Sequence, residues 1–356
     1  MQYEVNANTT ISRLIAIINK LLLVIAVLIT GVIAMAFFFY RGNHSQSTFE
    51  KNNAIAAATN DTKKDVEYWQ PQDINNIADA QLKAQVAYGK ELIVHTAKYL
   101  GPKGMVMQIS NGLNCQNCHL QAGTAVFGNN FGSVAALYPR FSARSGANEN
   151  VYKRVNDCFE RSLNGKALDT TTKEMQAIAA YINFIGANVE KGKKALGAGL
   201  KELPYLDRAA DTAKGNIVFI SKCQSCHQSN GEGVLTADKT EYVYPALWGN
   251  ASFNDAAGSY RITSLAKFVK CNMPLGATYN NPQLSDEEAW DVAAFINTRP
   301  RPHINVPKDW PDNFKKPIDH PFAPYADNFS EQQHKLGPFK PIIDAQKKTD
   351  MITTKR

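Results

Sequence analysis

Residues 115–119 read Cys-Gln-Asn-Cys-His, and the pattern returns at residues 223–227 as Cys-Gln-Ser-Cys-His. Two thiols three residues apart, followed at once by a histidine, form the covalent attachment signature of a c-type haem. The cysteines bind the haem vinyl groups, and the histidine becomes the proximal iron ligand. Zinc sites and redox dithiols are the alternatives, but the flanks of both copies favour haem. We therefore expect two covalently bound haems, held by Cys115, Cys118 and His119 and by Cys223, Cys226 and His227.

Each motif lies between two segments with helical periodicity. A helix is predicted from about residue 78 to residue 100, where Gly101-Pro102 follows, and another over residues 175–185. In the second copy, residues 214–220 lead into the motif and residues 287–297 close the unit. The closing segments at 179–183 and 293–297 match at an offset of 114 residues, which indicates an internal repeat. This order is that of a cytochrome c domain, so we predict a mainly α protein with two such domains in tandem.

The segments outside the two domains differ in composition. Nine of the 16 prolines lie from Pro300 onward, which excludes long helices there, while aromatic residues such as Trp310 and Phe339 argue against a disordered tail. We expect an extended strap that packs over the domains. The predicted division is a transmembrane segment at 1–40, a polar tether at 41–77, a first cytochrome c domain at 78–187, a linker at 188–206, a second cytochrome c domain at 207–300 and the strap at 301–356.

Residues 21–40, LLLVIAVLITGVIAMAFFFY, form an uncharged apolar run. As a helix it would be about 30 Å long, enough to cross a bilayer. Arg13 and Lys20 precede the run, so the residues after Tyr40 should lie on the periplasmic side of the bacterial inner membrane. A cleaved signal peptide, leaving a soluble periplasmic protein, is the alternative. The formal charge of +7 includes no dense basic cluster, so we expect no nucleic-acid binding.

The second axial ligand of the second haem is predicted from its surroundings. Between residues 227 and 287 the only methionine is Met273, which precedes a proline, and there is no histidine. A low-spin cytochrome haem takes such a ligand from the loop between the motif and the closing helix. We therefore predict Met273 as the ligand, with Cys271 and Lys270 as nearby alternatives.

The first domain has neither methionine nor histidine between residues 119 and 175. Only Cys158 and lysines such as Lys153 and Lys166 could reach the iron. Cys158 lies 21 residues before Ala179, and Met273 lies 20 before Ala293, so Cys158 occupies the ligand position. A buried small residue, or a disulfide with Cys271, are the alternatives.

The sequence around Cys158 is rich in cations. Arg144, Arg154, Arg161 and Ser162 lie near it. Positive charge beside a thiol favours the thiolate, which is the form that binds iron or attacks sulfur.

At these residues the chain resembles the dihaem thiosulfate dehydrogenase family. The resemblance runs through residues 114–120 (NCQNCHL), 122–124 (AGT), 144–146 (RSG), 154–165 (RVNDCFERSLNG), 272–276 (NMPLG) and 321–327 (PFAPYAD). It implies an active-site haem with His119 and Cys158 as ligands and Arg144, Arg154 and Ser162 in the substrate pocket. It also implies an electron-transfer haem on His227. Some members use a lysine beside the methionine there, and Asn272 at this position favours His/Met ligation with Met273.

The resemblance implies an enzyme that joins two thiosulfates into tetrathionate, with Cys158 as catalytic thiolate and arginines that offset the repulsion between dianions. Electrons would pass through both haems to a small soluble c-type cytochrome or a membrane terminal oxidase. The reverse reaction, tetrathionate reduction, is implied as well. The alternatives are a non-catalytic dihaem electron carrier with a structural Cys158, and an enzyme that conjugates thiosulfate to a protein cysteine.

Overall fold

The computed structural model describes residues 15–31 and 67–353, and the chain divides into two compact units, Met1–Val66 and Glu67–Arg356. In the first unit, residues 15–31 form a helix. Over the described residues, no helix combines the length and the apolar character needed to cross a bilayer. Residues 32–40 of the predicted span and residues 41–66 of the predicted tether lie outside the described residues.

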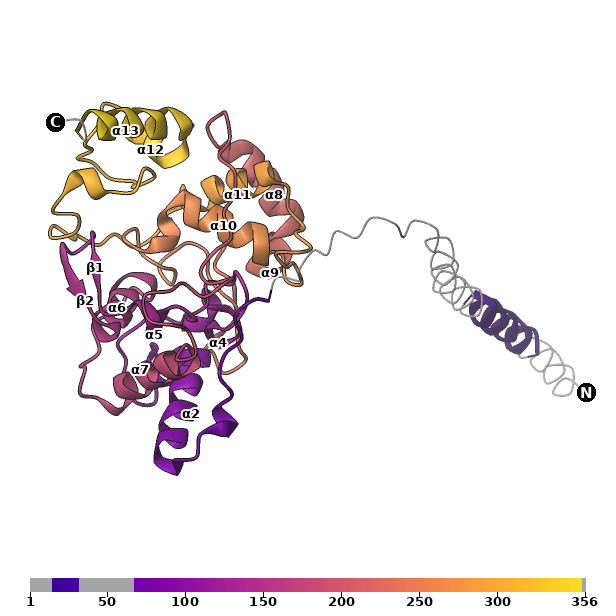
Figure 1. The fold of residues 1–356 in the computed structure, drawn as a ribbon. Coiled ribbons are helices and arrows are strands. Elements are labelled where there is room, and N and C mark those ends of the chain that lie inside the picture. Colours follow the sequence, from indigo (N-terminus) through magenta and orange to yellow (C-terminus); the bar gives the residue numbers. More distant parts are fainter. Residues whose placement is uncertain (1–14, 32–66, 354–356) are drawn as a thin grey trace, which may run out of the picture. The chain divides into compact units, whose positions relative to one another are not determined.

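The regular secondary structure of the second unit is mainly helical, as predicted (Figure 1). Its first half contains η1 (Ile74–Asn76), α2 (Ala80–Val94), α3 (Thr96–Leu100), η2 (Cys115–Asn117), α4 (Leu120–Gly123), α5 (Val134–Leu137), β1 (Arg140–Ser142), β2 (Ala147–Glu149), α6 (Val151–Asp157), the π-helical turn η3 (Cys158–Ser162) and α7 (Lys173–Ile185). Its second half contains α8 (Thr212–Lys222), α9 (Gln224–His227), β3 (Val234–Leu235), β4 (Tyr242–Tyr244), η4 (Gly258–Tyr260), α10 (Ile262–Asn272), α11 (Asp286–Asn297), η5 (Asn313–Lys315), α12 (Glu331–Leu336) and α13 (Lys340–Thr353).

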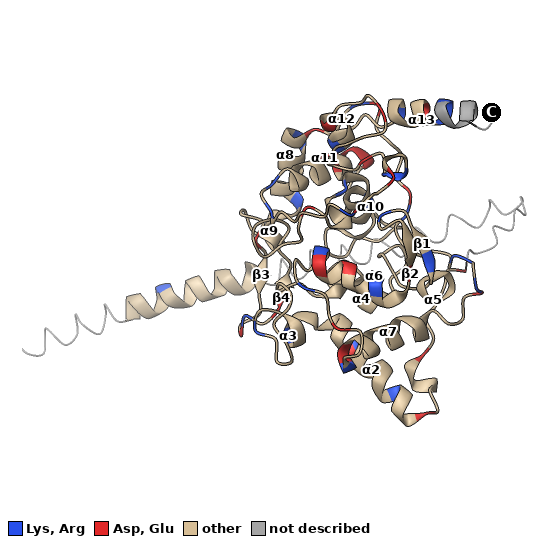
Figure 2. Ribbon diagram, turned by 90° about the vertical axis from the view of Figure 1, so that its left-hand side faces the viewer, with Lys and Arg blue, Asp and Glu red and all other residues tan. Residues whose placement is uncertain are grey.

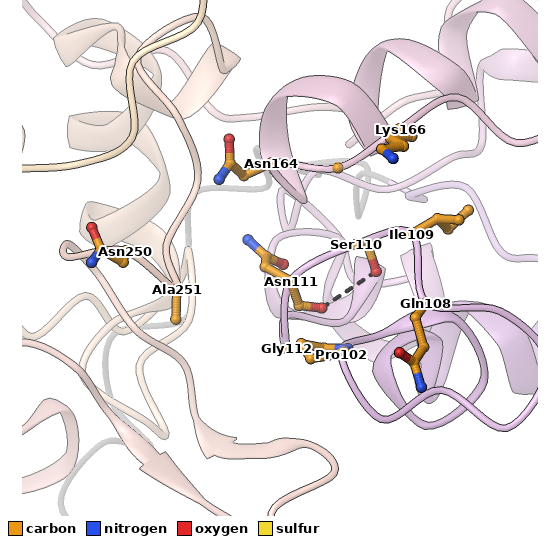
Figure 3. A pocket seen from close by; sticks show the side chains of 11 residues that line it. Pro102, Gln108, Ile109, Ser110, Asn111, Gly112, Asn164, Lys166, Asn250 and Ala251 are labelled. Atoms are coloured by element: carbon orange, nitrogen blue, oxygen red, sulfur yellow. Dashed lines mark hydrogen bonds between the residues drawn. The ribbon is translucent and has the colours of Figure 1, made fainter.

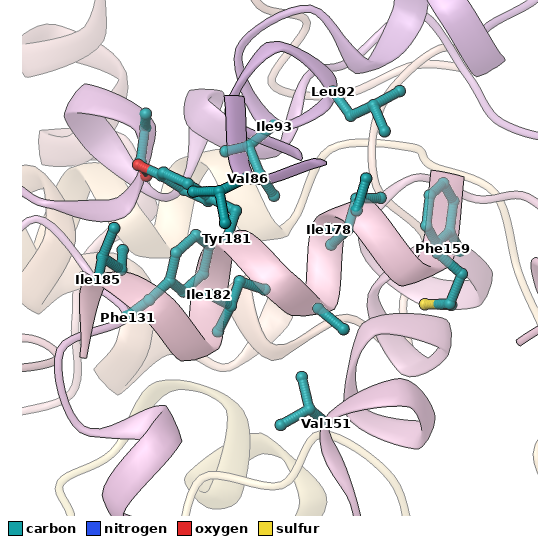
Figure 4. Packing of buried hydrophobic residues seen from close by; sticks show 14 of the residues in the cluster. Val86, Leu92, Ile93, Phe131, Val151, Phe159, Ile178, Tyr181, Ile182 and Ile185 are labelled. Atoms are coloured by element: carbon teal, nitrogen blue, oxygen red, sulfur yellow. Dashed lines mark hydrogen bonds between the residues drawn. The ribbon is translucent and has the colours of Figure 1, made fainter. Parts of the chain in front are cut away.

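The first hydrophobic core lies where α2 packs on α7 (Figure 4). Ile178 and Tyr181 of α7 are at most 1% exposed, and Val86 of α2 is fully buried. Phe159, from the turn η3, joins the same core and is 1% exposed. Burial of this ring fixes the residue that follows Cys158, and so fixes where the Cys158 side chain starts.

The second core repeats this arrangement with α8 packed on α11 and with α10 beside them. Trp290 of α11 is 1% exposed and donates its indole N–H to the carbonyl of Pro204 at 2.9 Å. Ser285 begins α11 with a capping box, because its hydroxyl accepts from the N–H of Glu288 and the Glu288 carboxylate accepts from the N–H of Ser285. The two domains thus contain the same type of helix pair, as the predicted tandem repeat requires.

The sequence predicts that the first domain opens with one continuous helix, but the structure has two helices there, α2 and α3. The predicted helix is broken at His95, whose φ of −122° and ψ of 42° are not helical. The His95 ring lies 3.0 Å from Glu241 on the loop between β3 and β4, and Glu241 also accepts a hydrogen bond from Asn114. The break therefore places a second-domain carboxylate next to the residue that precedes the first haem motif.

The expected absence of long helices after Pro300 is wrong at the very end of the chain. From residue 301 to residue 330 only the short turn η5 forms, as the prolines predict. Helix α13 then runs from Lys340 to Thr353. Its one proline, Pro341, lies in the first turn, where the missing N–H has no intrahelical acceptor to lose. Figure 1 shows α12 and α13 at the α11 end of the unit.

Each helix pair crosses at a glycine. A Cβ on Gly89 of α2 would lie 2.0 Å from the carbonyl oxygen of Ala177 on α7. A Cβ on Gly215 of α8 would lie 1.9 Å from the carbonyl oxygen of Asp291 on α11. In both domains, the backbones therefore approach so closely that no side chain fits between them.

We predict that Gly89→Ala lowers the free energy of unfolding by at least about 1–3 kcal/mol, because the helices must separate to admit the methyl group. Urea unfolding of the haem-loaded protein, followed by Soret circular dichroism, measures this. Gly258→Ala is the matched control, because nothing lies within 4 Å of the Cβ that it adds. Equal stability of the two variants would contradict the packing argument.

Candidate haem-thiolate site

The two motif histidines are oriented in the same way. Nδ1 of His119 lies 2.6 Å from the carbonyl oxygen of Asn129, and Nδ1 of His227 lies 2.8 Å from that of Pro245. A carbonyl oxygen can only accept, so Nδ1 donates in both rings. This hydrogen bond orients each ring with Nε2 pointing away from the carbonyl, which is the orientation that an imidazole needs to bind iron through Nε2.

Cys158 follows α6 directly and begins the π-helical turn η3. Asn150 caps α6 by accepting a hydrogen bond from the N–H of Lys153. Four residues before Cys158, Arg154 directs its guanidinium to the sulfur, with Nη1 3.2 Å from Sγ. The Cys158 thiol also forms a side-chain hydrogen bond with His119. The structure therefore brings together His119 and Cys158, 39 residues apart in sequence.

The charge of Cys158 depends on two opposed effects. Burial raises the pKa of its thiol, but the cation of Arg154 and the hydrogen bond to His119 outweigh burial and lower the pKa to about 6. Cys115 and Cys118 respond in the opposite way, because burial raises their pKa values to about 12 and about 11. At neutral pH, Cys158 is thus a thiolate while the motif cysteines are thiols.

The residues of this site fit a covalently attached haem. All three cysteines of the site, Cys115, Cys118 and Cys158, are partly buried. Each motif cysteine also interacts electrostatically with Cys158. Two neutral thiols for thioether bonds, one imidazole Nε2 and one thiolate form the donor set of a haem with His and Cys as axial ligands.

A comparable donor set occurs in the second domain. Met273 follows the last residue of α10 and packs, together with Cys223, against the second core. The competing donor Lys270 is engaged elsewhere, because its ammonium group donates to the carbonyl of Leu284 and pairs with Asp286, both at 2.7 Å. Cys271 is 4% exposed, and burial raises the pKa of its thiol. These observations favour Met273 over both alternatives.

The alternatives for Cys158 are also addressed by the structure. All six cysteines, each within the described residues, are free, so Cys158 and Cys271 form no disulfide. Lys153 donates to Asp157, and the exposed Lys166 lines a pocket that does not include Cys158. Neither lysine therefore competes with Cys158 for the position facing His119.

Arg154 contacts the thiolate, and Arg144 interacts electrostatically with both Arg154 and Arg161, but the three cations have different partners. Arg161 is buried and bonds to Asp157 at 2.6 Å and to both carboxylate oxygens of Asp309 at 2.8 and 3.0 Å. Arg154 and Arg144 form no salt bridge with a carboxylate among the described residues. Burial and the charges of Arg154 and Arg161 lower the pKa of Arg144. Two cations without a carboxylate salt bridge, Arg144 and Arg154, thus lie near each other, and Arg154 contacts Cys158. Such a pair of cations is an arrangement that an anion would bind.

Figure 2 shows that basic and acidic residues are otherwise interspersed over the ribbon. Ser162, the remaining predicted pocket residue, ends η3 and is partly buried. Its hydroxyl forms no hydrogen bond within residues 67–353, and no described contact joins it to Cys158. Its place in the pocket stays a prediction.

Several residues lie near the site although no motif or spacing in the sequence predicts them there. Tyr138 interacts electrostatically with Arg154 and Cys158, and Glu149 is buried close to Arg154. Ser259, on η4 of the second domain, forms a hydrogen bond with Cys118 of the first. The strap contributes Asp309. These contributions come from distant segments, so only the three-dimensional structure identifies them.

A pocket of about 480 Å³ opens between the two domains, away from the thiolate (Figure 3). Asn111 and Asn164 of the first domain face Asn250 and Ala251 of the second. The Asn111 amide also donates to the carbonyl of Ser252 at 3.1 Å, across the domain boundary. The pocket contains neither Cys158 nor an arginine, so it includes none of the residues predicted for the substrate site.

Comparisons with known proteins agree with this geometry. The family model described as SoxA/TsdA, cytochrome c domain, matches residues 106–189, and the Cytochrome c model matches residues 212–300. The thiosulfate dehydrogenase of Psychrobacter arcticus is 37% identical over 67% of this chain and 71% of its own length. That of Allochromatium vinosum is 39% identical over 61% of this chain and 81% of its own length.

The fold has a similar solved structure. It is a thiosulfate dehydrogenase (TsdBA) from Marichromatium purpuratum, with a TM-score of 0.61 and 27% identity over 67% of this chain. The match covers 50% of the length of that longer chain.

We predict that Asp309→Asn lowers the free energy of unfolding by about 1–3 kcal/mol, because the buried cation of Arg161 loses its charge-assisted hydrogen bonds. Asp157 still pairs with Arg161 and limits the loss. Urea unfolding measures the effect. Asp312→Asn is the control, since the exposed pair between Asp312 and Lys315 should contribute less than about 1 kcal/mol. Similar losses in both variants would contradict the assigned role of Asp309.

Proposed function

The chain belongs to the SoxA/TsdA family of thiosulfate dehydrogenases, and from this membership we propose that it joins two thiosulfate ions into tetrathionate. The observation that carries the proposal is the Cys158 thiolate, which faces His119 and lies 3.2 Å from the guanidinium of Arg154. A thiolate at the ligand position of a haem is a nucleophilic sulfur, and the haem beside it would be the electron acceptor.

In the first step, the sulfane sulfur of one thiosulfate forms a bond with the Cys158 sulfur. The balance is RS⁻ + S₂O₃²⁻ → RS–S–SO₃⁻ + 2 e⁻, where RS⁻ is the Cys158 thiolate. Two anions must meet, so the cations of Arg144 and Arg154, neither of which forms a salt bridge with a carboxylate among the described residues, lower the repulsion between them. Bound covalently, the two haems supply iron centres that accept the two electrons singly.

In the second step, the sulfane sulfur of another thiosulfate attacks the sulfane sulfur attached to Cys158. The S–S bond to the protein breaks, giving RS–S–SO₃⁻ + S₂O₃²⁻ → RS⁻ + S₄O₆²⁻. This is a thiol-disulfide exchange, and it is favoured by a leaving thiolate of low pKa. Arg154 again stabilises the Cys158 thiolate as it departs. The same steps in reverse would reduce tetrathionate.

We assign the roles of the two domains as follows. His119 and Cys158 would hold the active-site haem, His227 and Met273 would hold the electron-transfer haem, and Arg144, Arg154 and Ser162 would line the substrate pocket. The second domain would then pass electrons to a small soluble c-type cytochrome or a membrane terminal oxidase. We place both domains on the periplasmic side of the inner membrane, anchored by the apolar run of residues 21–40.

We predict that Cys158→Gly abolishes thiosulfate turnover but leaves haem attachment intact, because Cys115, Cys118 and His119 remain. Cys158→Met tests the covalent step, since a thioether can restore iron ligation without forming a persistent bond to thiosulfate. Turnover measured with ferricyanide or a cytochrome acceptor should fall to background in both variants.

The matched control is Cys271→Ser, which changes a buried thiol of the second domain and should retain turnover. If the methionine variant stays active, Cys158 acts only as an iron ligand and the covalent mechanism is wrong. If the glycine variant also stays active, the active site lies elsewhere in the protein. If the native protein lacks thiosulfate turnover, it is instead a dihaem electron carrier or another enzyme.

We predict that cell fractionation finds the full-length chain in the membrane, because residues 21–40 would bury an uncharged apolar helix in the bilayer. A variant that begins after Tyr40, fused to a cleavable signal peptide, should carry both haems and appear in the soluble periplasmic fraction. A native mature protein that begins after Tyr40 and is soluble would rule out the anchor.

A further inference from the structure

The strap touches the first domain at the turn that carries Arg144. Figure 1 shows the chain after α11 passing beside the tips of β1 and β2. The N–H of Trp310 donates to the carbonyl of Arg144 at 2.6 Å. A Cβ on Gly146 would lie 2.7 Å from Cγ of Pro311, and the φ of Gly146 is +67°. The turn between β1 and β2 is therefore shaped to receive this part of the strap.

The backbone of Trp310 is held in an unusual conformation. Its φ is +60°, a value that a bulky aromatic residue rarely adopts. Such conformations cost free energy and persist only where the surrounding structure imposes them, often at functional sites. Here the carbonyl of Arg144 and the carboxylate of Asp309 hold the backbone on either side of the ring.

The Trp310 ring lies under the Arg144 guanidinium, whose central carbon is 5.7 Å from the ring centroid. This distance is within the range of a cation–π interaction, and tryptophan is its strongest partner. Burial and the cations of Arg154 and Arg161 lower the pKa of Arg144, and the carboxylates of Asp309 and Asp157 oppose this effect only in part. The negative face of the indole offsets that repulsion without occupying the hydrogen-bond donors of the guanidinium.

The neighbouring residue acts on a different arginine. Asp309 binds Arg161 through both carboxylate oxygens, so it neutralises that cation. Two consecutive strap residues thus contact two different arginines through different interactions. Asp309 pairs Arg161 with a carboxylate, while Trp310 supports Arg144 and leaves its N–H groups available to an anion.

We propose that Trp310 is a positioning residue that holds Arg144 toward the substrate anion, a deduction that rests on the proposed function. The ring keeps the guanidinium near Arg154, so that two cations with free donors face the thiosulfate at Cys158. Trp310 therefore sets the affinity for a doubly charged tetrahedral anion. It does not touch the reacting sulfur atoms.

Trp310→Leu and Trp310→Phe separate the ring's charge distribution from its bulk. Leucine fills space without a π face, whereas phenylalanine keeps one. We expect Trp310→Leu to raise the KM for thiosulfate about 3- to 30-fold, as the loss of a cation–π interaction of about 0.5–2 kcal/mol predicts. The kcat should change less than twofold. Trp310→Phe should recover most of the affinity.

Sulfate provides a readout that does not depend on turnover, because it has the charge and shape of thiosulfate but no sulfane sulfur. Calorimetric titration of the haem-loaded variants with sulfate, at constant ionic strength, should show its Kd rising in parallel with KM. Phe314→Leu is the control, since Phe314 lies in the same strap, is 75% exposed and has no described contact with an arginine.

Unchanged sulfate affinity in Trp310→Leu, or equal losses with leucine and phenylalanine, would overturn the proposal and leave Trp310 as a structural brace. If the native protein binds sulfate with the predicted dependence on Trp310 but does not oxidise thiosulfate, the proposed function fails and the positioning role stands. If the native protein oxidises thiosulfate and Trp310→Leu has native KM, the proposed function stands and the positioning role fails.

Discussion

The contact between the Arg154 guanidinium and the Cys158 sulfur is the interaction on which the rest of the site depends. An enclosed thiolate without a cation would take up a proton, because the protein interior disfavours the charged form. The spacing of four residues puts Arg154 and Cys158 on one face of α6 as it passes into η3. The burial of Phe159 in the first core then prevents this turn from shifting.

The site also shows why the two haem domains are not independent modules. Ser259 of the second domain bonds to a motif cysteine of the first, and the Asn254 amide donates to the carbonyl of Glu160 within η3 at 2.9 Å. In the opposite direction, the Asn272 amide beside the predicted ligand Met273 donates to the carbonyl of Phe127, in the loop after the first motif, at 3.1 Å. Each axial ligand region is thus supported by the other domain.

Sequence reasoning succeeded for the domains, because the CxxCH motifs and the helical periodicity beside them are carried by short segments. The spacing that singles out Cys158 and Met273 is local as well, and their assignment as ligands stays a prediction. Sequence reasoning failed where tertiary contacts decide. The break at His95 depends on a carboxylate at Glu241, and the contacts of Asp309 and Trp310 span about half the chain. The number of prolines was taken over the whole strap, although none follows Pro341. The helix-forming residues after Pro341 were therefore missed.

The position of Trp310 in chain order has a consequence for biogenesis. The thiolate, its arginines and both attachment motifs precede residue 300, but the wall beside Arg144 is made by residues that follow both domains. If the chain is translocated as proposed, its motif cysteines would emerge before the residues that contact Arg144. Under the proposed role of Trp310, both haems could then be attached before the chain is able to hold its substrate.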